Sequence, residues 1–279
     1  EASKELFISQ PGLTTSIREL ETEMGIKIFT RTNKGVVTSN EGERFLGYAR
    51  QVLEQASLLE GVYKSGTKIK QQFCVSTQHY SFAVNAFVDL IRRFAGEEYD
   101  FSLRETETYE IIDDVAKMKS EIGILYLNSF NKDALMKIIK SKSLTFTELF
   151  TAKPHVFVST DHPLADKKSV TMEELADYPY LSFEQGEHNS FYYSEEIFST
   201  VGRTKNIRVT DRATLFNLLI GLNGYTVCSG VIDNELNGDN ITAIPLDEEG
   251  NMKIGYIENK KILHSNLAEA YIEALKKHI

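Results

Sequence analysis

The sequence predicts an α/β protein in which a small helical region and one long helix precede a larger region of alternating strands and helices. Three observations lead to this prediction. A capped helical pattern covers residues 10–24, a heptad pattern covers 45–63, and strand-like and helical runs alternate from about residue 72. Such alternation is typical of a sheet with helices on its faces, and we expect that sheet to be mostly parallel.

Composition and charge exclude several classes of protein. The 279 residues suffice for one large domain or two to three small ones, and 42% are hydrophobic, as in ordinary globular proteins. No run reaches the roughly 20 apolar residues that span a bilayer. The net charge of −9 argues against indiscriminate binding to nucleic acid, but residues 1–70 carry +1. An anionic partner would therefore meet local basic groups in the N-terminal region.

The cysteines and the N-terminus indicate the compartment. Cys74 and Cys228 lie in separate apolar, strand-like runs, where we expect free thiols in a reducing cytosol. The opening residues do not resemble a signal peptide, because no basic start precedes a hydrophobic run. We therefore expect a cytoplasmic protein that does not contact a membrane.

The first helix that we expect covers residues 10–24. Ser9 suits the N-cap, Pro11 the first turn and Gly25 the position after the last turn. Apolar residues recur at spacings of three and four and so share one helical face: Leu13, Ile17, Leu20 and Met24.

The opposite face of this helix suits DNA. The preceding run "EASKELFI" reads as another short helix, and two short helices joined by a tight turn form a helix-turn-helix, whose second helix can enter a major groove. Gln and Arg side chains can pair with base edges, and Thr can contact phosphates or a thymine methyl. The residues on this face are Gln10, Thr14, Thr15 and Arg18. An ordinary amphipathic surface helix is the alternative.

A wing and a long helix follow. The run "RTNKGVVTS" reads as a turn between two short strands, with Arg31 and Lys34 placed to contact phosphates. Thr38 and Glu41 fit a capping box at the start of the long helix. Its heptad seam predicts pairing with a second copy, although packing on the chain's own core is the alternative. The seam consists of Phe45, Ala49, Val52, Ala56, Leu59 and Tyr63.

The run "SQPGLTTSIRELETEMGIKIFTRTNKGVVTSNEG" resembles the winged helix-turn-helix of LysR-type transcriptional regulators. The resemblance rests on Ser9-Gln10-Pro11, Leu20-Glu21, Met24-Gly25, Ile28 to Arg31 and Thr38 to Gly42, with Met24 and Ile28 in place of the usual Leu. It implies that the family's first helix is missing from this sequence. The DNA-binding residues that it implies are Ser9, Gln10, Pro11, Thr14, Thr15, Arg18, Arg31, Asn33 and Lys34.

The rest of the chain resembles the effector domain of the same family, which is similar to periplasmic binding proteins. We therefore expect a DNA-binding domain over residues 1–38, a linker and dimerisation helix over 39–66, and a two-lobed α/β effector domain over 72–279. Lobe one would comprise residues 72–150 and 252–279, and lobe two residues 151–251.

A ligand site is expected where strands give way to helices, because pockets form beyond the carboxyl ends of strands and helix N-termini favour anions. Hydroxyl and amide groups dominate these junctions, which suits a small anion or zwitterion. Arg212 could bind a carboxylate or pair with Asp211. The candidate effector-binding residues are Ser76, Thr77, Gln78, His79, Thr106, Tyr126, Asn128, Thr210, Arg212 and Ser229. The family resemblance favours Thr77, Tyr126 and Thr210 among them.

Within the family, the runs "STQHYSF", "SEIGILYLN", "YYSE" and "VTDRATL" resemble regulators of cysteine and methionine metabolism in Gram-positive bacteria. That resemblance implies a sulfur-amino-acid precursor such as O-acetylserine as effector, with no cofactor. The partners implied are an operator in double-stranded DNA, further copies in a homodimer or homotetramer, and RNA polymerase. A solute-binding protein without a DNA-binding role and an enzyme are the alternatives.

Other chemistry finds little support in the sequence. His155 and His162 lack further ligands at metal-binding spacing, so we expect no metal site. Glu105 and Glu107 alternate with other residues along one strand, and we expect them to lie on a solvated face. No catalytic or nucleotide-binding motif is present, and we expect no enzyme.

Overall fold

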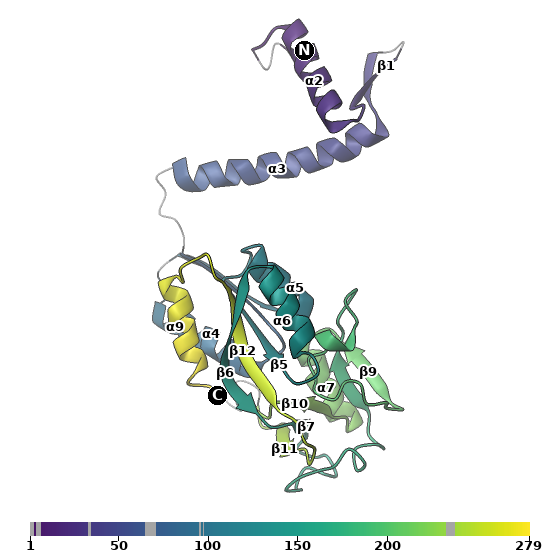
Figure 1. The fold of residues 1–279 in the computed structure, drawn as a ribbon, viewed down its shortest axis with the longest axis vertical. Helices are drawn as coiled ribbons and strands as arrows, with labels where there is room; N and C mark the ends of the chain where they lie inside the picture. Colours follow the sequence, from purple (N-terminus) through teal and green to yellow (C-terminus); the bar gives the residue numbers. More distant parts are fainter. Residues whose placement is uncertain are drawn as a thin grey trace. The chain divides into compact units, whose positions relative to one another are not determined.

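The computed structural model describes residues 3, 7–32, 35–64, 71–94, 96, 98–232 and 238–279. The chain divides into two compact units, Glu1–Ile69 and Lys70–Ile279, which are described separately here (Figure 1). Asn33 and Lys34 lie outside the described residues, as do the side chains of Leu59 and Tyr63. Within the described part, no helix has both the length and the apolar composition to cross a membrane.

The first unit begins with helix α2, Gln10–Met24, which has the predicted bounds. Its N-cap is Ser9, whose hydroxyl accepts a hydrogen bond from the Gly12 N–H at 3.2 Å. Gly25 ends the helix at φ 66°, a left-handed conformation that glycine adopts at little cost. The predicted capping residues at both ends are therefore confirmed.

Glu21 connects α2 to the segment that follows it. Its carboxylate is buried and accepts hydrogen bonds from the N–H groups of Ile28 at 2.7 Å and Phe29 at 3.0 Å. The Phe29 N–H contributes most to holding the pKa of Glu21 below its usual value. An acidic residue at this point of α2 thus fixes the direction in which the chain leaves the helix.

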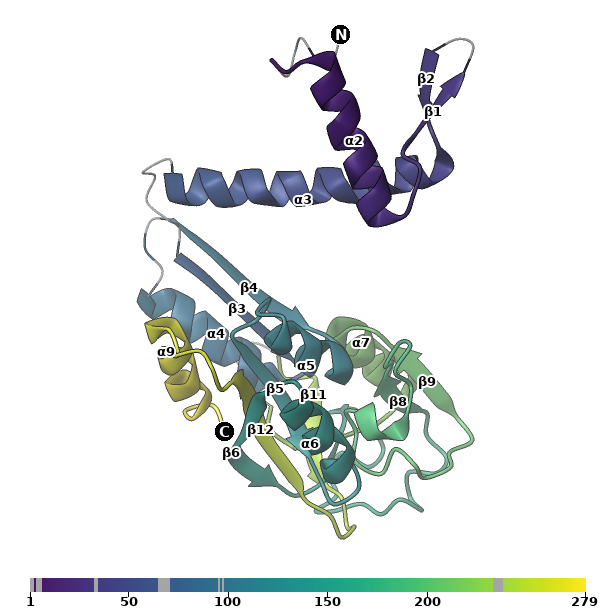
Figure 2. The ribbon, with the colours of Figure 1, turned by 45° about the horizontal axis from the view of Figure 1, so that its top comes forward.

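A hairpin of β1, Phe29–Thr32, and β2, Gly35–Thr38, leads into the long helix α3, Asn40–Lys64 (Figure 2). The capping residue of α3 is not Thr38, as the sequence suggested, but Ser39, whose hydroxyl accepts from the Gly42 N–H at 2.9 Å. Thr38 pairs with Phe29 as the last residue of the hairpin, so Ser39 is the first residue free to cap the helix.

Lobe one of the second unit is built on a five-stranded sheet in the order β4-β3-β5-β12-β6. Four of its strands, β3, β4, β5 and β6, run in one direction, and only β12 runs the opposite way, so the prediction of a mostly parallel sheet is confirmed for lobe one. β6 carries the chain out to lobe two and β12 brings it back. The two strands therefore run in opposite directions, and they pair with each other. The bounds are β3 Gln71–Thr77, β4 Tyr99–Glu105, β5 Ile122–Leu127, β6 Leu144–Ala152 and β12 Met252–Asn259.

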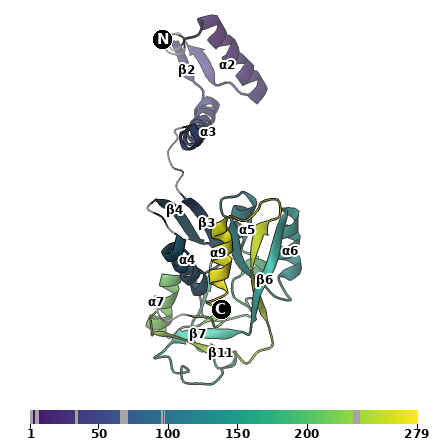
Figure 3. The same ribbon diagram turned by 90° about the vertical axis from the view of Figure 1, so that its left-hand side faces the viewer.

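Helices cover both faces of this sheet (Figure 3). One buried cluster joins α4, Ser81–Phe94, and α9, Asn266–Leu275, to one face. A second cluster joins α5, Thr108–Ala116, and α6, Lys132–Ser141, to the other. Every residue of the central strand β5 is buried, as expected for a strand packed on both sides.

Lobe two contains a three-stranded antiparallel sheet in the order β10-β7-β11 and a parallel pair, β8 and β9. Helix α7, Arg212–Leu222, packs against these strands through a third buried cluster. The sequence did not predict β11, α6 or the short 3-10 helix η1, Phe191–Tyr193. The strand bounds are β7 His155–Ser159, β8 Tyr180–Phe183, β9 Asn206–Val209, β10 Thr226–Cys228 and β11 Ile241–Pro245.

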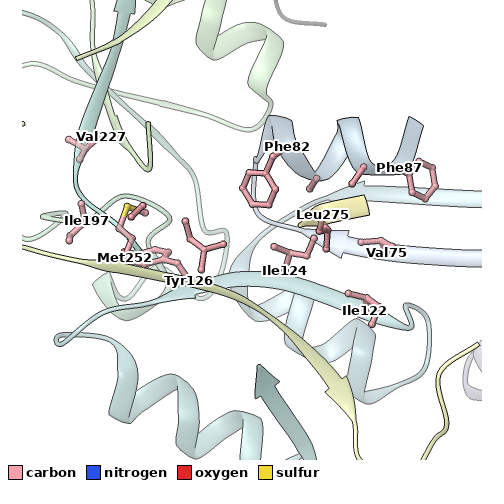
Figure 4. Packing of buried hydrophobic residues seen from close by; sticks show 14 of the residues in the cluster. Val75, Phe82, Phe87, Ile122, Ile124, Tyr126, Ile197, Val227, Met252 and Leu275 are labelled. Atoms are coloured by element: carbon pink, nitrogen blue, oxygen red, sulfur yellow. The ribbon is translucent and has the colours of Figure 1, made fainter. Parts of the chain in front are cut away.

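The two lobes share one hydrophobic core. Tyr126 and Met252 of lobe one belong to the same buried cluster as Ile197 and Val227 of lobe two (Figure 4). This continuity holds the lobes together at the base of the space between them.

Gly42 provides a test of the first unit. A Cβ there would lie 2.2 Å from the Ile28 carbonyl oxygen, so Gly42→Ala must separate α3 from the segment that Glu21 holds. We expect a loss of about 1–3 kcal/mol of local stability. Hydrogen exchange of peptides from residues 10–38 should then be faster by about 5- to 100-fold.

The matched control is Gly47→Ala in the same helix, where a Cβ would meet no atom within 4 Å. This change should leave exchange unaltered or slow it slightly, because alanine favours a helix more than glycine does. Equal exchange in the two variants would show that the close contact at Gly42 does not limit stability.

Candidate functional site

The face of α2 expected to meet DNA is largely open. Ser9, Gln10, Pro11, Thr15 and Arg18 are exposed, as is Arg31 on β1. Thr14 is partly buried, and its hydroxyl donates to the Gln10 carbonyl oxygen at 2.9 Å. The hydroxyl of Thr14 is thus bonded within its own helix, whereas Thr15 and Arg18 present their side chains to the outside.

In the second unit, Gln78 joins the carboxyl ends of neighbouring strands. Its amide nitrogen donates to the Thr108 hydroxyl at 2.6 Å. Its amide oxygen accepts from the Tyr126 N–H and the Tyr80 hydroxyl, each at 3.0 Å. Gln78 is only 1% exposed, so these bonds are shielded from water.

Ser76 and Thr77 are fully buried within lobe one. The Ser76 hydroxyl donates to the Asp114 carboxylate at 2.8 Å and contacts the Ser120 hydroxyl at 2.7 Å. The Thr77 hydroxyl donates to the Gln78 carbonyl oxygen at 2.7 Å. In this arrangement both hydroxyls are bonded within the lobe.

A cavity of about 40 Å³ lies between the lobes, with room for about one or two water molecules. We call it the interlobe cavity. Lobe one and β12 contribute His79, Tyr80, Ser81 and Met252, and lobe two contributes the other lining residues. These are Phe157, Phe183, Glu195, Glu196, Arg212, Leu215, Phe216, Thr226, Val227, Cys228, Ser229 and Val231.

A buried polar contact across this cavity joins Glu195 of lobe two to His79 of lobe one. The Glu195 carboxylate accepts from the His79 backbone N–H at 2.9 Å, and it lies 2.9 Å from the His79 ring nitrogen Nδ1. Burial disfavours the charged ring, but the surrounding carboxylates, Glu195 first among them, together raise the pKa of His79. The ring also stacks on Phe183, with centroids 3.8 Å apart.

Gln185 extends this connection. Its amide nitrogen donates to Glu195 at 3.0 Å, and its amide oxygen accepts from the Thr108 N–H, in the first turn of α5, at 3.0 Å. Two aromatic contacts from the same segment of lobe two also reach lobe one. His188 stacks on Tyr109 with centroids 3.5 Å apart, and Tyr192 stacks on Phe130 at 4.8 Å.

A second ionic contact crosses the lobes between Arg212 and Glu105, at 3.2 Å. Glu105 is therefore not on a solvated face, as the sequence suggested, because the end of β4 turns it toward α7. Burial raises the pKa of Glu105, and Arg212 opposes that change. Asp211, the alternative partner of Arg212, instead caps α7 by accepting from the Thr214 N–H at 2.8 Å.

Glu196 lines the same cavity and is 3% exposed. Its carboxyl accepts a hydrogen bond from the Phe183 N–H at 2.7 Å. Burial raises the pKa of Glu196 to about 8, and the adjacent Glu195 adds to this shift. At neutral pH the carboxyl is therefore largely protonated.

The structure brings only some of the candidate effector-binding residues to this cavity. His79, Arg212 and Ser229 line it. Thr106 donates its N–H to the Thr77 carbonyl oxygen, and Asn128 accepts from two N–H groups at the start of α6. Tyr126 is buried in the core, and Thr210 is exposed.

Sequence reasoning missed Gln185, Glu195 and Glu196, which are central to the site. They lie in an irregular segment between β8 and β9, where no strand-to-helix junction draws attention to them. The run "YYSE" ends in Glu195, but nothing in its pattern indicates that this side chain is buried.

The described residues offer little for catalysis. They contain no group of three or more His, Cys, Asp or Glu side chains that could hold a metal ion. Cys228 lines the interlobe cavity, but burial raises the pKa of its thiol and so suppresses the nucleophilic thiolate.

Comparison with known families identifies both units. A family model described as "LysR substrate binding domain" matches residues 75–279, and one described as "Bacterial regulatory helix-turn-helix protein, lysR family" matches residues 1–43. The chain belongs to the LysR family.

Three curated relatives are transcriptional regulators rather than enzymes. YnfL of Escherichia coli is 28% identical over 187 residues, which is 66% of this chain and 59% of that protein. CysB of Burkholderia cenocepacia is 28% identical over 190 residues, which is 66% of this chain and 57% of that protein. The RuBisCO operon transcriptional regulator of Allochromatium vinosum is 27% identical over 207 residues, which is 73% of this chain and 64% of that protein. The chain thus spans about three fifths of the length of these relatives.

Solved structures support the fold. Full-length BenM is similar with a TM-score of 0.50 and 20% identity, covering 99% of this chain and 89% of that one. A hydrogen-peroxide-bound mutant of OxyR from Corynebacterium glutamicum is similar with a TM-score of 0.51 and 17% identity, covering 99% of this chain and 87% of that one. The two-lobed α/β architecture predicted from the sequence is confirmed.

The protonated Glu196 carboxyl predicts a pH dependence of stability. In the unfolded chain its pKa returns to about 4.5, below the folded value of about 8. The contribution of Glu196 is therefore complete below about pH 4.5 and is lost as the pH rises through about 8. Glu196→Gln cannot ionise, so it should exceed the natural chain by about 2–4 kcal/mol at pH 9 and match it near pH 5.

Denaturation of both proteins from pH 5 to 9, followed by tyrosine near-ultraviolet circular dichroism, measures this difference. Glu187→Gln is the control, because Glu187 is exposed in the same segment. The difference in unfolding free energy between Glu187→Gln and the natural chain should not vary with pH. A constant difference for Glu196→Gln would rule out a proton held by Glu196.

Proposed function

We propose that this chain is a ligand-responsive transcriptional regulator that binds double-stranded DNA through its first unit and a small metabolite between its lobes. One observation supports both halves of the proposal. The chain combines an exposed, capped helix in a regulatory helix-turn-helix match with a two-lobed unit that encloses a cavity. A solute-binding protein without a DNA-binding role would leave the first unit unexplained.

The proposed division into domains follows the sequence: residues 1–38 bind DNA, 39–66 form the linker helix and 72–279 bind the effector. We propose that two copies pair along α3. Val52 is 67% exposed and Leu53 68% exposed, although both are apolar. Ala56 is exposed as well, whereas Phe45 and Ala49 are half-buried. Pairing would cover this apolar surface and place two recognition helices at two half-sites.

The proposed response to a metabolite uses the contacts between the lobes. A ligand larger than the interlobe cavity enters only when Glu195 separates from His79 and Arg212 separates from Glu105. Ligand binding then shifts the balance between lobe arrangements by its difference in affinity for them. Side-by-side effector domains in a homotetramer would carry that shift to the DNA-binding units. RNA polymerase is a further partner in this proposal.

The proposed effector is a small anionic or zwitterionic metabolite. O-acetylserine is the first compound to test, because four runs of the sequence resemble regulators of cysteine and methionine metabolism. No cofactor is part of this proposal.

The direct test is a footprint on the region upstream of the gene that encodes this chain. The protein, expressed from its native gene, should protect tens of base pairs at low salt, and the pattern should change when its metabolite is added. Protection that is absent at low salt would rule out the regulatory function.

Arg18 tests the mode of DNA recognition. Arg18→Ala should weaken binding to the protected sequence by about 10- to 100-fold, because a good contact from Arg to a base edge is worth about 1–3 kcal/mol. Titrations by fluorescence anisotropy with protected and unrelated duplexes measure this effect.

Arg50→Ala is the control, because it removes the same charge from an exposed position on α3. On the unrelated duplex the two variants should behave alike. A loss for Arg18→Ala that is equal on both duplexes would show that Arg18 contacts the backbone rather than a base.

A further inference from the structure

We propose that the ligand of the interlobe cavity carries a protonated amino group and that Glu196, together with Glu195, binds that group. The inference rests on the proposed function, in which this cavity is the effector site. It narrows the ligand class from any small anion or zwitterion to compounds that bear an ammonium group.

The charges around the cavity support this choice. Glu195 and Glu196 are consecutive carboxylic acids, 7% and 3% exposed, and both line the cavity. Arg212 also lines it but contacts Glu105 at 3.2 Å, and His79 is held by Glu195. Both positive lining groups are therefore already paired with carboxylates, whereas the Glu196 carboxyl has no cation beside it.

Glu196 lacks a positive partner. Among the described residues, no Lys, Arg or His nitrogen lies within 4.0 Å of its carboxyl. Its carboxyl accepts hydrogen bonds from the Phe183 N–H at 2.7 Å and from its own backbone N–H, whereas a carboxylate has about four acceptor positions. Several acceptor positions are left for a donor that arrives with a ligand.

A buried carboxylate without a partner is unstable, and it must gain either a proton or a cation. A ligand ammonium would supply the missing positive charge together with N–H donors. An anion without an amino group would instead add negative charge beside the Glu195 carboxylate and would bring no cation to Glu196, which disfavours it. A site built on two carboxyl groups differs from the neutral site of hydroxyls and amides that the sequence suggested.

The walls of the cavity suit the same ligand. Phe157, Phe183 and Phe216 line it, and aromatic ring faces attract cations and exclude water. Once Arg212 has separated from Glu105, as the proposed function requires, its guanidinium could meet a carboxylate on the same ligand. The arrangement therefore favours a small amino acid over sulfate or thiosulfate.

The experiment compares matched ligands on the full chain. Thermal-shift assays would screen the standard amino acids with the N-acetyl form of each, O-acetylserine with its isomer N-acetylserine, and sulfate and thiosulfate. We expect every stabilising compound to carry a free ammonium group. Calorimetry should then show that acetylation of that amino group weakens binding by at least about tenfold.

Variants separate recognition from structural support. Glu196→Gln keeps an acceptor for the Phe183 N–H but removes the charge. It should weaken binding of the amino compound by at least about tenfold and bring its affinity close to that of the N-acetyl partner. Glu187→Gln, exposed in the same segment, should keep the preference of the natural chain.

Three results would overturn the inference. The natural chain could bind an inorganic anion or an N-acetyl compound more tightly than the amino compound, or it could bind no amino compound at all. Glu196→Gln could also lose equal affinity for the amino compound and for its N-acetyl partner. The footprint separates these failures from failure of the regulatory function. Protection that responds to an anion without an amino group would support the function and refute the ammonium site.

Discussion

The arrangement of the effector unit depends on one buried hydrogen-bonded contact, in which the Glu195 carboxylate of lobe two accepts from the backbone N–H of His79 in lobe one. Charge-assisted hydrogen bonds of this kind are strong, and burial protects them from competition with water. Gln185 links the same carboxylate to the first turn of α5. One irregular segment of lobe two therefore holds the beginnings of two helices of lobe one.

The same segment creates an electrostatic problem at the next residue. Because Glu195 is committed to His79, Glu196 is buried beside a negative charge, and its raised pKa follows. Buried groups that lack a partner lower stability, and natural proteins keep them mainly at functional sites. The closed lobes and the unpaired carboxyl are thus two consequences of one local packing arrangement.

Much of the fold could be read from periodicity. α2 has the predicted bounds because Ser9 and Gly25 act locally, through hydrogen bonds to residues a few positions away. The errors arose where distant partners decide the outcome. Pairing with Phe29 removes Thr38 from the capping position, and the return of β12 from lobe two places one antiparallel strand between β5 and β6. Glu105 left its expected solvated face because Arg212, more than a hundred residues away, packs against it.

The sequence by itself determined the bounds of α2, the alternation of strands and helices in the second unit and the family resemblance, because each depends on local patterns or on motifs of fixed spacing. Only the tertiary structure decided which side chains face the interlobe cavity. It turned the hydroxyls of Ser76 and Thr77 into lobe one and brought Glu195 and Glu196 to the cavity. Burial and hydrogen-bond partners set these roles, and both come from residues remote in the sequence.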